Sequence, residues 1–504
     1  MTANAIAPEF KAFAEKYDAG EPQVLLKRII SDLETPVSAY LKLAGARDNA
    51  FLLESVEGGD QLGRYSIIGY KPDLIWRVRD GKAEINDRAA SETDAFRPDD
   101  GPPLERLKAL LAASRIKMPI DAPPMAAGVF GYLGYDIVRE IERLPDRPPA
   151  AIDTPDSIFI RPTVVAVFDN VRQEIIFVAT ARPEPGVSAR AAYARAAERI
   201  ADSVSALAAP LAIPQRATVT PTPPQDISSN TPHADYLDMV NKAKEEIFAG
   251  EIFQVVLSQR FQAPLEAPPF ELYRALRRTN PSPFLFYLKF DDHAVVGSSP
   301  EILVRVRNGE VTIRPIAGTR KRGATPEEDQ ALADELLADP KECAEHLMLL
   351  DLGRNDVGRA AAYGSVNVTE SFKIERYSHV MHIVSNVTGK LADGVDSVDA
   401  VMAGFPAGTV TGAPKVRAME IIDALERDGR GPYGGAIGYF AADGDVDTCI
   451  ALRTAIVKDG VMHVQAGAGV VADSVPQSEY EECQNKAKAL FSAAQAADKI
   501  NNQQ

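Results

Sequence analysis

Cysteine and long apolar runs are both scarce in this chain of 504 residues. With only three cysteines, a disulfide framework is not expected, and a reducing compartment fits. No stretch approaches the roughly 20 consecutive apolar residues of a membrane helix, and the first residues lack the apolar core of a signal peptide. We therefore predict a cytoplasmic protein that has no membrane partner.

Positive charge is also in short supply. The chain has 55 Lys and Arg against 71 Asp and Glu, which gives a net charge of −16. Because clustered cations are needed to neutralise phosphates, no nucleic-acid partner is expected. A small anionic substrate needs only a few local positive groups and is not excluded. Hydrophobic residues make up 45% and charged residues 25%, which excludes the disordered and fibrous classes.

A segment rich in proline, serine and threonine divides the sequence. Residues 207–232 show no apolar periodicity, and they follow a predicted helix over 189–208 that is rich in Ala and Arg. We place a boundary near residue 220 for this reason. The predicted organisation is an N-terminal region, a linker and a second domain, at 1–210, 211–231 and 232–495.

The two halves contain segments that resemble each other. SIIGYKPDLIWRVRDG begins at Ser66 and AVVGSSPEILVRVRNG begins at Ala294, at a constant offset of 228 residues. Six positions are identical, and Asp73 in the first segment matches the acidic Glu301 in the second. Each copy is predicted to form a strand, a Gly-Pro turn and a second strand that ends at a turn. An ancient duplication explains this match better than two unrelated hairpins do.

The duplication predicts two related β-rich subdomains packed as a sandwich, with helices outside. Because predicted strands and helices cluster instead of alternating, we expect an α+β fold. Strands are predicted at 158–169, 174–180, 253–262, 284–290, 311–316, 435–441, 449–457 and 461–471. Helices are predicted at 326–338, 341–352, 396–404, 414–426 and 476–497.

Paired glutamates begin two of these helices. Glu342 and Glu345 are three residues apart and share a helix face. Glu479, Glu482 and Lys486 form one stripe on the other helix. Each pair alone is more typical of an ordinary helix start, where the helix dipole favours acidic residues. Together they would form an oxygen-rich site suited to Mg²⁺, which binds a few carboxylates plus water and substrate oxygens.

Three single residues are further candidates for chemistry. His382 lies in a predicted strand, where a histidine is usually a satisfied core residue, although imidazole also suits general acid catalysis. Arg453 interrupts the apolar strand predicted over 449–457, so its charge needs a partner. That partner is either a protein carboxylate or a substrate carboxylate. Tyr433, in a turn between proline and glycine, could donate its phenol.

Two glycine-rich stretches differ from phosphate-binding loops. QAGAGVVAD, which begins at Gln465, continues as a strand instead of opening into a helix, so dinucleotide binding is excluded. Its amides at Gly467, Ala468 and Gly469 could still bind a carboxylate. GTVTGAPK, which begins at Gly408, lacks the spacing of a P-loop, but it leads into a helix and its amides could receive an anion.

The motifs around these residues closely resemble those of the chorismate-utilising family. The resemblance covers nearly all of the second half, and it is specific because the motifs are long and ordered. They are PIAGTRKRG (315–323), DPKECAEHLMLLDLGRNDVGR (339–359), YSHVMHIVSNVTG (377–389), FPAGTVTGAPK (405–415), PYGGAIGYF (432–440) and QAGAGVVADSVPQSEYEEC (465–483).

Two departures narrow the resemblance to the anthranilate-forming branch of this family. Ala317 stands where aminodeoxychorismate-forming members typically have a lysine that captures the substrate ring, and alanine is no nucleophile. Gln254 stands where the water-activating isochorismate and salicylate members have a lysine base, and glutamine accepts no proton at neutral pH. Aminodeoxychorismate synthesis is the alternative enzyme function. A catalytically inert sensor of chorismate or tryptophan is the alternative outside enzymes.

The resemblance implies a Mg²⁺-dependent reaction of chorismate with ammonia. Ammonia adds at ring carbon C2 while the C4 hydroxyl leaves, and pyruvate is then eliminated as the ring becomes aromatic. His382 would be the general acid for the hydroxyl, and Thr409 would act beside it at the ring. The implied metal ligands are Glu345 and Glu482, with Glu342 and Glu479 close by or bound through water. The implied substrate-binding residues are Gly318, Thr319, Tyr433, Arg453, Gly467, Ala468, Gly469 and Lys486.

A second implied site involves the first half. FLLESVEGGDQLGRYSIIG (51–69) resembles the tryptophan feedback element of the family, and NPSPFLFYL (280–288) resembles its second wall. The N-terminal region would therefore be regulatory, with tryptophan as inhibitor, and the second domain catalytic. Cys449 would lie nearby, four residues before Arg453 on one predicted strand, and would couple the two sites. The implied tryptophan-binding residues are Glu54, Ser55, Pro283, Phe284 and Leu285.

The ammonia requires a source. A glutamine amidotransferase of the matching type needs a cysteine nucleophile at a glycine-flanked turn, and none of Cys343, Cys449 and Cys483 has flanking glycines. The resemblance therefore implies a separate glutamine amidotransferase subunit and a hetero-oligomer. Free ammonia would serve as an alternative substrate.

Overall fold

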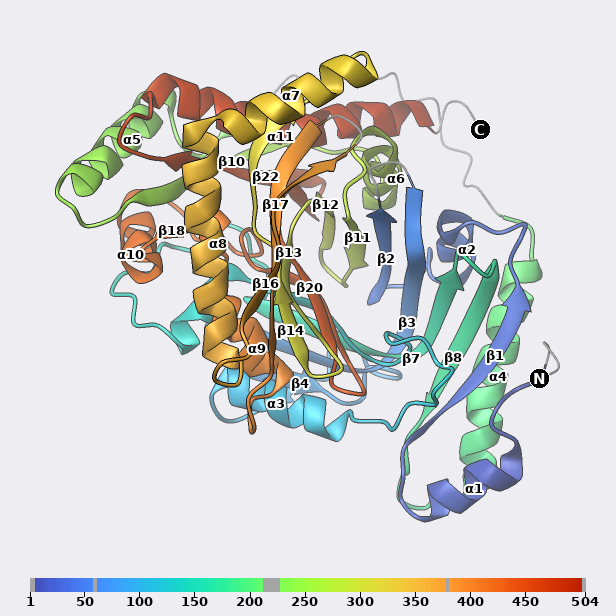
Figure 1. Cartoon of the computed structure of the whole chain (residues 1–504). Helices are drawn as coiled ribbons and strands as arrows, with labels where there is room; N and C mark the ends of the chain where they lie inside the picture. Colours follow the sequence, from blue (N-terminus) through green and yellow to red (C-terminus); the bar gives the residue numbers. More distant parts are fainter. Residues whose placement is uncertain (1–4, 58–60, 212–226, 378–379, 501–504) are drawn as a thin grey trace.

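Long antiparallel strands form the frame of the molecule. The computed structural model describes residues 5–57, 61–211, 227–377 and 380–500 (Figure 1). Its strands form one hydrogen-bonded network that divides into two sheets, both of which contain β3 (Gln61–Arg79) and β7 (Ser157–Asp169). These two strands pair with each other, and their register shifts between Pro72 and Leu74. On either side of this shift, both strands have different neighbours.

The remaining strands extend from β3 and β7 in two directions. In order, the first sheet adds β8 (Glu174–Ala181) and then β1 (Gln23–Ile30) beyond β7. Beyond β3 it adds β2 (Ala50–Glu57), β11 (Phe284–Lys289), β12 (Ala294–Ser299), β21 (Thr454–Lys458), β22 (Val461–Val470) and β10 (Gln254–Pro264). The short strands β9 (Ser228–Ser229) and β18 (Gly412–Ala413) pair with β10. The second sheet adds β4 (Lys82–Asn86) and then β5 (Arg97–Pro98) beyond β3. Beyond β7 it adds β6 (Gly128–Leu133), β19 (Ala436–Ala441), β20 (Val446–Ile450), β13 (Ile302–Arg307), β14 (Glu310–Ile313) and β17 (Val380–Lys390). Both β15 (Ile316–Lys321) and β16 (Asn367–Arg376) pair with β17.

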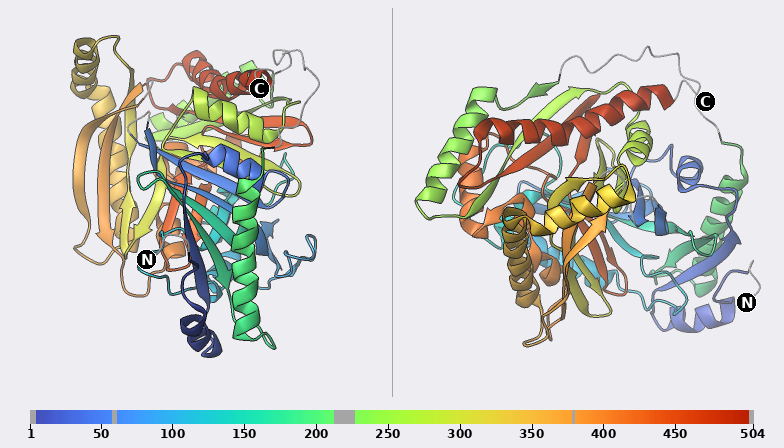
Figure 2. Two further views of the ribbon diagram at one scale, coloured as in Figure 1. Left: turned by 90° about the vertical axis from the view of Figure 1, so that its right-hand side faces the viewer. Right: turned by 45° about the horizontal axis from the view of Figure 1, so that its top comes forward.

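Helices cover the outside of these sheets, as two further views show (Figure 2). α8 (Pro340–Ala360) packs on β15 and β17, and α11 (Pro476–Ile500) packs on β22 against α5 (His233–Phe248) and α6 (Pro269–Thr279). The others are α1 (Phe10–Asp18), α2 (Pro36–Leu43), α3 (Pro103–Ala113), α4 (Ala189–Ala208), α7 (Pro326–Ala338), α9 (Ser397–Gly404) and α10 (Lys415–Leu425), with 3₁₀ turns at Tyr135–Glu140 and Gly408–Val410. None of the helices in the described ranges combines the length and the apolar character needed to cross a membrane.

The two sheets pack face to face. Phe51 on β2 stacks on Phe130 on β6, with ring centroids 4.3 Å apart. The same buried cluster contains Phe286 and Val295 from the first sheet and Ile437 from the second. The structure therefore confirms the predicted α+β fold, a sandwich with helices outside.

The duplicated segments pack in the same way in both halves. Gly69 on β3 lies opposite Phe51, and a side-chain carbon at Gly69 would come within 2.2 Å of that ring. Gly297 on β12 lies opposite Phe286 on β11, and a side-chain carbon there would again come within 2.2 Å of the ring. In each half, a strand glycine makes room for a phenylalanine of the neighbouring strand. This shared packing supports the inferred duplication.

Three details of the strand prediction are wrong. The strand predicted over 449–457 is divided into β20 and β21, because Arg453 has a φ of 48° that a strand cannot continue. The strand predicted over 311–316 is divided into β14 and β15 at Pro315, which lacks an N–H. The first copy of the duplicated segment is one long strand, β3, because the register shift after Pro72 absorbs the proline without a turn.

The halves share their hydrophobic cores. One buried cluster combines Trp76 with Val304 and Phe405. The backbone ladders also cross between halves, since β2 pairs with β11 and β6 pairs with β19. The halves therefore form one packed unit. Most of the predicted linker, 212–226, lies outside the described residues, and the predicted domain bounds and roles stay predictions.

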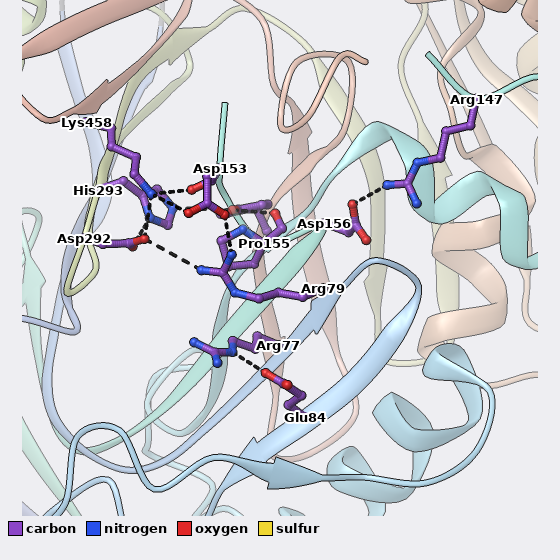
Figure 3. Close-up of polar contacts among 11 residues, drawn as sticks. Arg77, Arg79, Glu84, Arg147, Asp153, Pro155, Asp156, Asp292, His293 and Lys458 are labelled. Carbon is purple, nitrogen blue, oxygen red and sulfur yellow. Dashed lines mark hydrogen bonds and ion pairs between the residues drawn. The ribbon is translucent and has the colours of Figure 1, made fainter. Parts of the chain in front are cut away.

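Charged side chains also join the halves (Figure 3). Lys458 on β21 forms ion pairs with Asp292 (2.9 Å) and with Asp153 (3.3 Å), which lies in the loop before β7. Arg79, at the end of β3, pairs with Asp153 (2.8 Å). His293 is buried, and its Nδ1 lies 2.6 Å from Asp292 Oδ1. This cluster ties the start of β7 to two hairpins of the second half.

Candidate active site

A cavity of about 1090 Å³ lies where the first turns of α8 and α11 face β17, β22 and the start of β10. Asp339 caps α8 by accepting hydrogen bonds from the amides of Lys341 (3.0 Å) and Glu342 (3.3 Å), and this cap fixes where the helix begins. Nearly all predicted site residues line the cavity. They are Gly318, Thr319, Glu342, Glu345, His382, Thr409, Tyr433, Arg453, Gly467, Gly469, Glu479, Glu482 and Lys486. Their individual roles stay predictions.

Glutamates from two helices meet at one wall of this cavity. Burial raises the pKa of Glu345, and the nearby carboxylates of Glu342 and Glu482 raise it further. Burial also raises the pKa of Glu479, again with a contribution from Glu482. Carboxylates that repel one another in a partly dry site are stabilised by a cation, so this oxygen donor set fits a hard divalent ion such as Mg²⁺.

Protein side chains alone do not complete a metal site here. In the parts of the chain that the structure describes, no group of three or more His, Cys, Asp or Glu side chains is placed to hold a metal ion. Mg²⁺ usually keeps several waters and binds substrate oxygens, so a site with few protein ligands is compatible with it. The remaining ligands would come from water and substrate.

Basic side chains balance part of the negative charge. Lys486 forms an ion pair with Glu482 (2.7 Å), four residues earlier on α11, and donates to the carbonyl oxygen of Gly467 (2.9 Å). Arg320 pairs with Glu342 (3.1 Å). The other two glutamates have no ion pair with any described residue, which leaves them available to a cation.

His382 on β17 is buried in a fixed orientation. Its Nδ1 lies 2.8 Å from the carbonyl oxygen of Gly318 and 3.2 Å from Oγ1 of Thr319. A carbonyl oxygen only accepts hydrogen bonds, so Nδ1 carries the proton and Nε2 keeps a lone pair. Burial lowers the pKa of His382, and the charge of Arg453 adds to this effect. The neutral ring is therefore suited to accept a proton at Nε2.

Arg453 reaches the cavity from a strained backbone position between β20 and β21. Its φ of 48° lies in the left-handed region, which is costly for a residue with a side chain. Its carbonyl oxygen accepts a hydrogen bond from the amide of Ser298 (3.2 Å). The guanidinium makes no hydrogen bond or ion pair within the described ranges, and burial lowers its pKa. The second partner that the sequence allows, a substrate carboxylate, stays a prediction.

The glycines of β22 let other side chains approach the cavity. A side-chain carbon at Gly469 would lie 2.7 Å from Nε2 of Gln254, and one at Gly467 would lie 2.9 Å from the hydroxyl of Tyr433. Ala468 is fully buried in the core and is not among the residues that line the cavity, and the predicted role of its amide stays a prediction. Successive residues of a strand face opposite sides, which turns Ala468 away from its two neighbours.

Sequence reasoning missed one cavity residue, Glu301, which follows the end of β12. Glu301 is buried without an ion pair to any described residue, and burial raises its pKa to about 8. The hydroxyl of Thr409 lies beside it and is buried without a hydrogen bond of normal geometry. The matching Asp73 of the duplicated segment instead pairs with Arg161 (2.7 Å). The acidic match was visible in the sequence, but the missing counter-ion is visible only in the fold.

Comparison with known proteins decides the family of this site. Residues 61–492 match the family described as chorismate binding enzyme. The chain belongs to this family.

Relatives of this chorismate binding enzyme cover almost its whole length. The anthranilate synthase component 1 of Cereibacter sphaeroides is 57% identical over 489 residues, which are 97% of each chain. That of Thermus thermophilus is 48% identical over 94% of this chain and 98% of its own. The structure of anthranilate synthase component I from Streptococcus pneumoniae has a TM-score of 0.75 at 37% identity, and covers 92% of this chain and 99% of that one. The menaquinone-specific isochorismate synthase of Escherichia coli has a TM-score of 0.70 at 19% identity over 94% and 95%, a likeness of fold alone.

Both residues that narrow the family assignment line the cavity. Ala317 and Gln254 are part of its wall in this chorismate binding enzyme. The side-chain amide of Gln254 donates a hydrogen bond to the carboxylate of Glu345 and opposes the rise in the pKa of that group. Gln254 therefore orients a candidate metal ligand and supplies no base.

The residues predicted to bind tryptophan lie side by side on two paired strands. Ser55 of β2 is opposite Phe284 of β11, Glu54 is opposite Leu285, and Pro283 directly precedes β11. The carboxylate of Glu54 is buried and is held by Arg277 (2.7 Å) and by the hydroxyl of Tyr273. Sequence reasoning missed these two partners, which lie more than 200 residues away. The role in tryptophan binding stays a prediction.

The predicted coupling strand between Cys449 and Arg453 is not continuous, but another contact joins the two sites. Cys449 lies beside Ser299, whose hydroxyl hydrogen-bonds the thiol. Ser299 is the strand partner of Phe284 on β11. The preceding residue, Ser298, donates its amide hydrogen to Arg453. β12 therefore connects the predicted tryptophan residues to the cavity.

Proposed function

We propose that this chain is component 1 of an anthranilate synthase, which converts chorismate and ammonia into anthranilate and pyruvate in the first committed step of tryptophan biosynthesis. The observation that carries the proposal is the 57% identity to a curated component 1 over 97% of both chains. The assembled cavity supports it and disfavours an inert sensor. Ala317 disfavours aminodeoxychorismate synthesis, because alanine cannot capture the substrate ring.

Mg²⁺ is part of this proposal. Glu345 and Glu482 would hold the ion directly, with Glu342 and Glu479 close by or bound through water. The raised pKa of Glu345 and its lack of an ion pair among the described residues support this assignment. When bound, Mg²⁺ neutralises the ring carboxylate of chorismate and withdraws electrons from the ring.

The enolpyruvyl carboxylate of chorismate needs a separate cation. We assign it to Arg453, with Tyr433 as a hydrogen-bond donor, because the Arg453 guanidinium is unpaired within the described residues. Lys486 and the segment Gly318–Thr319 would hold the ring side. The negative substrate would therefore contact cations at both ends. Because only a few local cations are needed for this, the proposal is compatible with the negative net charge of the chain.

Departure of the C4 hydroxyl needs a proton donor, and we assign this role to Glu301. With a pKa of about 8, its carboxyl group is protonated at neutral pH. As ammonia adds at C2, Glu301 gives its proton to the departing hydroxyl, which leaves as water. The sequence-based interpretation gives this role to His382. The geometry favours Glu301, because His382 is neutral and its one ring proton is bonded to Gly318.

His382 is placed for the elimination of pyruvate. Its Nε2 would accept the proton from ring carbon C2 while the bond between C3 and the enolpyruvyl oxygen breaks. The released enolpyruvate takes up a proton and becomes pyruvate, and the electrons of the C2–H bond complete the aromatic ring. The tautomer that Gly318 imposes on His382 supports this role.

We further propose that a separate glutamine amidotransferase supplies the ammonia. The name component 1, carried by the relatives, implies a second component. Burial raises the pKa of the thiols of Cys449 and Cys483, which disfavours both as nucleophiles. Cys343 donates its thiol hydrogen to the carbonyl oxygen of Leu337 (3.3 Å). A partner that carries its own nucleophilic cysteine is therefore the expected source.

One assay tests the proposed function. Purified chain is incubated with chorismate, ammonium and Mg²⁺, and anthranilate is followed by its fluorescence. We expect anthranilate with ammonium, none after chelation of Mg²⁺, and none from glutamine without the partner subunit. Release of aminodeoxychorismate, or no turnover of chorismate, would contradict the proposal.

A further inference from the structure

A second, smaller cavity lies directly behind Glu301. Its volume is about 30 Å³, and Glu301, Leu349 and Thr409 line both this cavity and the large one. The rest of its wall is largely apolar and comes from β13, β14, α8 and the segment Gly404–Gly408, which runs from the end of α9 to the 3₁₀ turn. Among the described residues that line it, Glu301 and Asp356 are the only two with ionisable side chains. The small cavity therefore lies between two residues with carboxyl side chains.

Asp356, on α8, is held by a buried lysine. Nζ of Lys415, at the start of α10, lies 3.0 Å from one carboxylate oxygen and 3.1 Å from the other. The side chain of Asp356 is 9% exposed and that of Lys415 is 11% exposed. Burial raises the pKa of Asp356 and lowers that of Lys415, which makes the proton between them easier to transfer. Arg359 and Glu142, which also interact with Lys415, pair with each other nearer the surface.

The small cavity has room and polar partners for water. A buried water needs about 10–15 Å³ of such space and two to four polar partners. Glu301, Asp356 and Thr409 all line the cavity, and each has a polar side chain that can bind water. The hydroxyl of Thr409 is buried without a hydrogen bond of normal geometry in the described part of the chain. The phenol of Tyr377 is the other titratable group that interacts with Glu301.

We propose that the Asp356–Lys415 pair returns a proton to Glu301 in each turnover, through water in the small cavity. This inference rests on the proposed function, in which Glu301 gives its proton to the departing hydroxyl. The ammonium group of Lys415 passes a proton through Asp356 and the water to the Glu301 carboxylate, and neutral Lys415 regains a proton from solvent. The charge balances because the nitrogen that adds to the ring releases one proton. Asp356 and Lys415 act through Glu301 and are positioning residues.

A double variant tests this relay. Asp356→Asn combined with Lys415→Met removes both charges and so leaves no unpaired charge buried. We expect kcat with ammonia to fall by about tenfold or more. This decrease should be smaller than the decrease caused by loss of a general acid, which is typically about 100-fold or more. The solvent deuterium isotope effect on kcat should rise, and KM for chorismate should stay unchanged. The matched control is Asp351→Asn, on the same helix but exposed and paired with Arg354 at the surface.

A second variant separates the relay from a structural role of the ion pair. Leu352→Phe fills the small cavity from α8 and leaves the pair intact, and we expect the same fall in kcat and the same larger isotope effect. Leu347→Phe, at an exposed position of the same helix, is its control. A folded double variant with wild-type kcat and isotope effect would overturn the relay but leave the proposed function standing. Wild-type chain that makes no anthranilate from chorismate and ammonium would overturn both.

Discussion

Glu301 and Asp73 occupy the same position in two copies of one segment but have different surroundings. Asp73 is paired with Arg161, whereas Glu301 is buried without a counter-ion among the described residues. Burial disfavours the charged form of an unpaired carboxyl group, so Glu301 stays protonated near neutral pH. The same acidic position therefore forms an ion pair in one half and is the proton donor that we propose in the other.

Glu301→Gln should remove the proton donor while it keeps the shape of the side chain. We expect kcat to fall by about 100-fold or more, because a positioned general acid contributes at least that much. In the wild type, kcat/KM should fall as pH rises through about 8, since Glu301 then loses its proton. The measurement is a pH profile at a constant concentration of unprotonated ammonia. An alkaline limb that persists unchanged in Glu301→Gln would contradict the assignment.

His382→Gln should separate the two chemical steps. Glutamine fills similar space but accepts no proton, so ammonia addition should continue while loss of pyruvate slows. We expect the aminated, non-aromatic intermediate that still carries the enolpyruvyl group to accumulate, as detected by chromatography and mass spectrometry. If His382 is instead the acid for the hydroxyl, the variant should leave chorismate unconverted and form no intermediate.

Among the elements, β12 combines tight packing with a connecting role. Gly297 lies against the ring of Phe286, Ser298 holds the backbone of Arg453, and Ser299 contacts Cys449. The strand ends one residue before Pro300, and Glu301 follows. A displacement of β12 would therefore affect both Arg453 and Glu301, the residues that we propose as the substrate-binding cation and the proton donor.

Gly297→Ala should destabilise the protein through this packing. Because the new carbon would lie 2.2 Å from the Phe286 ring, we expect a loss of about 1–3 kcal/mol in the free energy of unfolding. Urea denaturation followed by circular dichroism measures it. Gly358→Ala is the matched control, since the nearest atom lies 4.0 Å away and alanine favours a helix. Equal stability of the two variants would show that the strand adapts.

Ser55→Arg tests the regulatory assignment of β2 and β11. Ser55 is the strand partner of Phe284, so a large charged side chain there should block the space predicted for tryptophan. We expect weaker inhibition by tryptophan, with kcat without tryptophan unchanged. Inhibition curves for the wild type and the variant, measured at one chorismate concentration, provide the comparison. Unaltered inhibition would place the regulatory pocket elsewhere.

At the scale of the whole molecule, the charge cluster around Lys458 joins the halves. His293 and then Lys458 lower the pKa of Asp292, and Arg79 and then Lys458 lower that of Asp153. A carboxyl group with a lowered pKa in the folded state adds stability above its unfolded pKa of about 3.9, and this is lost as pH falls. The cluster should therefore contribute to the stability of the folded state at neutral pH and not in acid.

Lys458→Met should lower Tm at pH 7 by removing a cation shared by two carboxylates. The difference from the wild type should shrink as pH falls below about 4, where the aspartates of the unfolded chain take up protons before those of the folded protein do. Thermal denaturation across this pH range measures the effect. Lys373→Met, which removes an exposed surface pair with Glu370, should change Tm little at any pH. A difference that stays constant with pH would mean that lost packing, and not charge, is responsible.

Short-range patterns in the sequence were sufficient to predict much of the fold and of the candidate site. Asp339 and Pro340 mark the start of α8, and helical spacing places Glu342 and Glu345 on one face of it. Nearly all of the catalytic, substrate-binding and metal-binding residues that the family motifs predict then line the cavity. These features depend on contacts within one or two helical turns or on residue identity, both of which can be read along the sequence.

Other features depend on segments that are far apart in the chain. The missing counter-ion of Glu301, the positive φ of Arg453, the contact between Glu54 and Arg277, and the small cavity between Glu301 and Asp356 all follow from how strands and helices pack. Burial and long-range pairing set the charge of a side chain, and neither can be recognised from the type of the residue or from its neighbours in the sequence. The residue types therefore belong to the sequence, whereas the tertiary structure decides which carboxyl groups meet in the cavity, which is buried without a described counter-ion and which forms an ordinary ion pair.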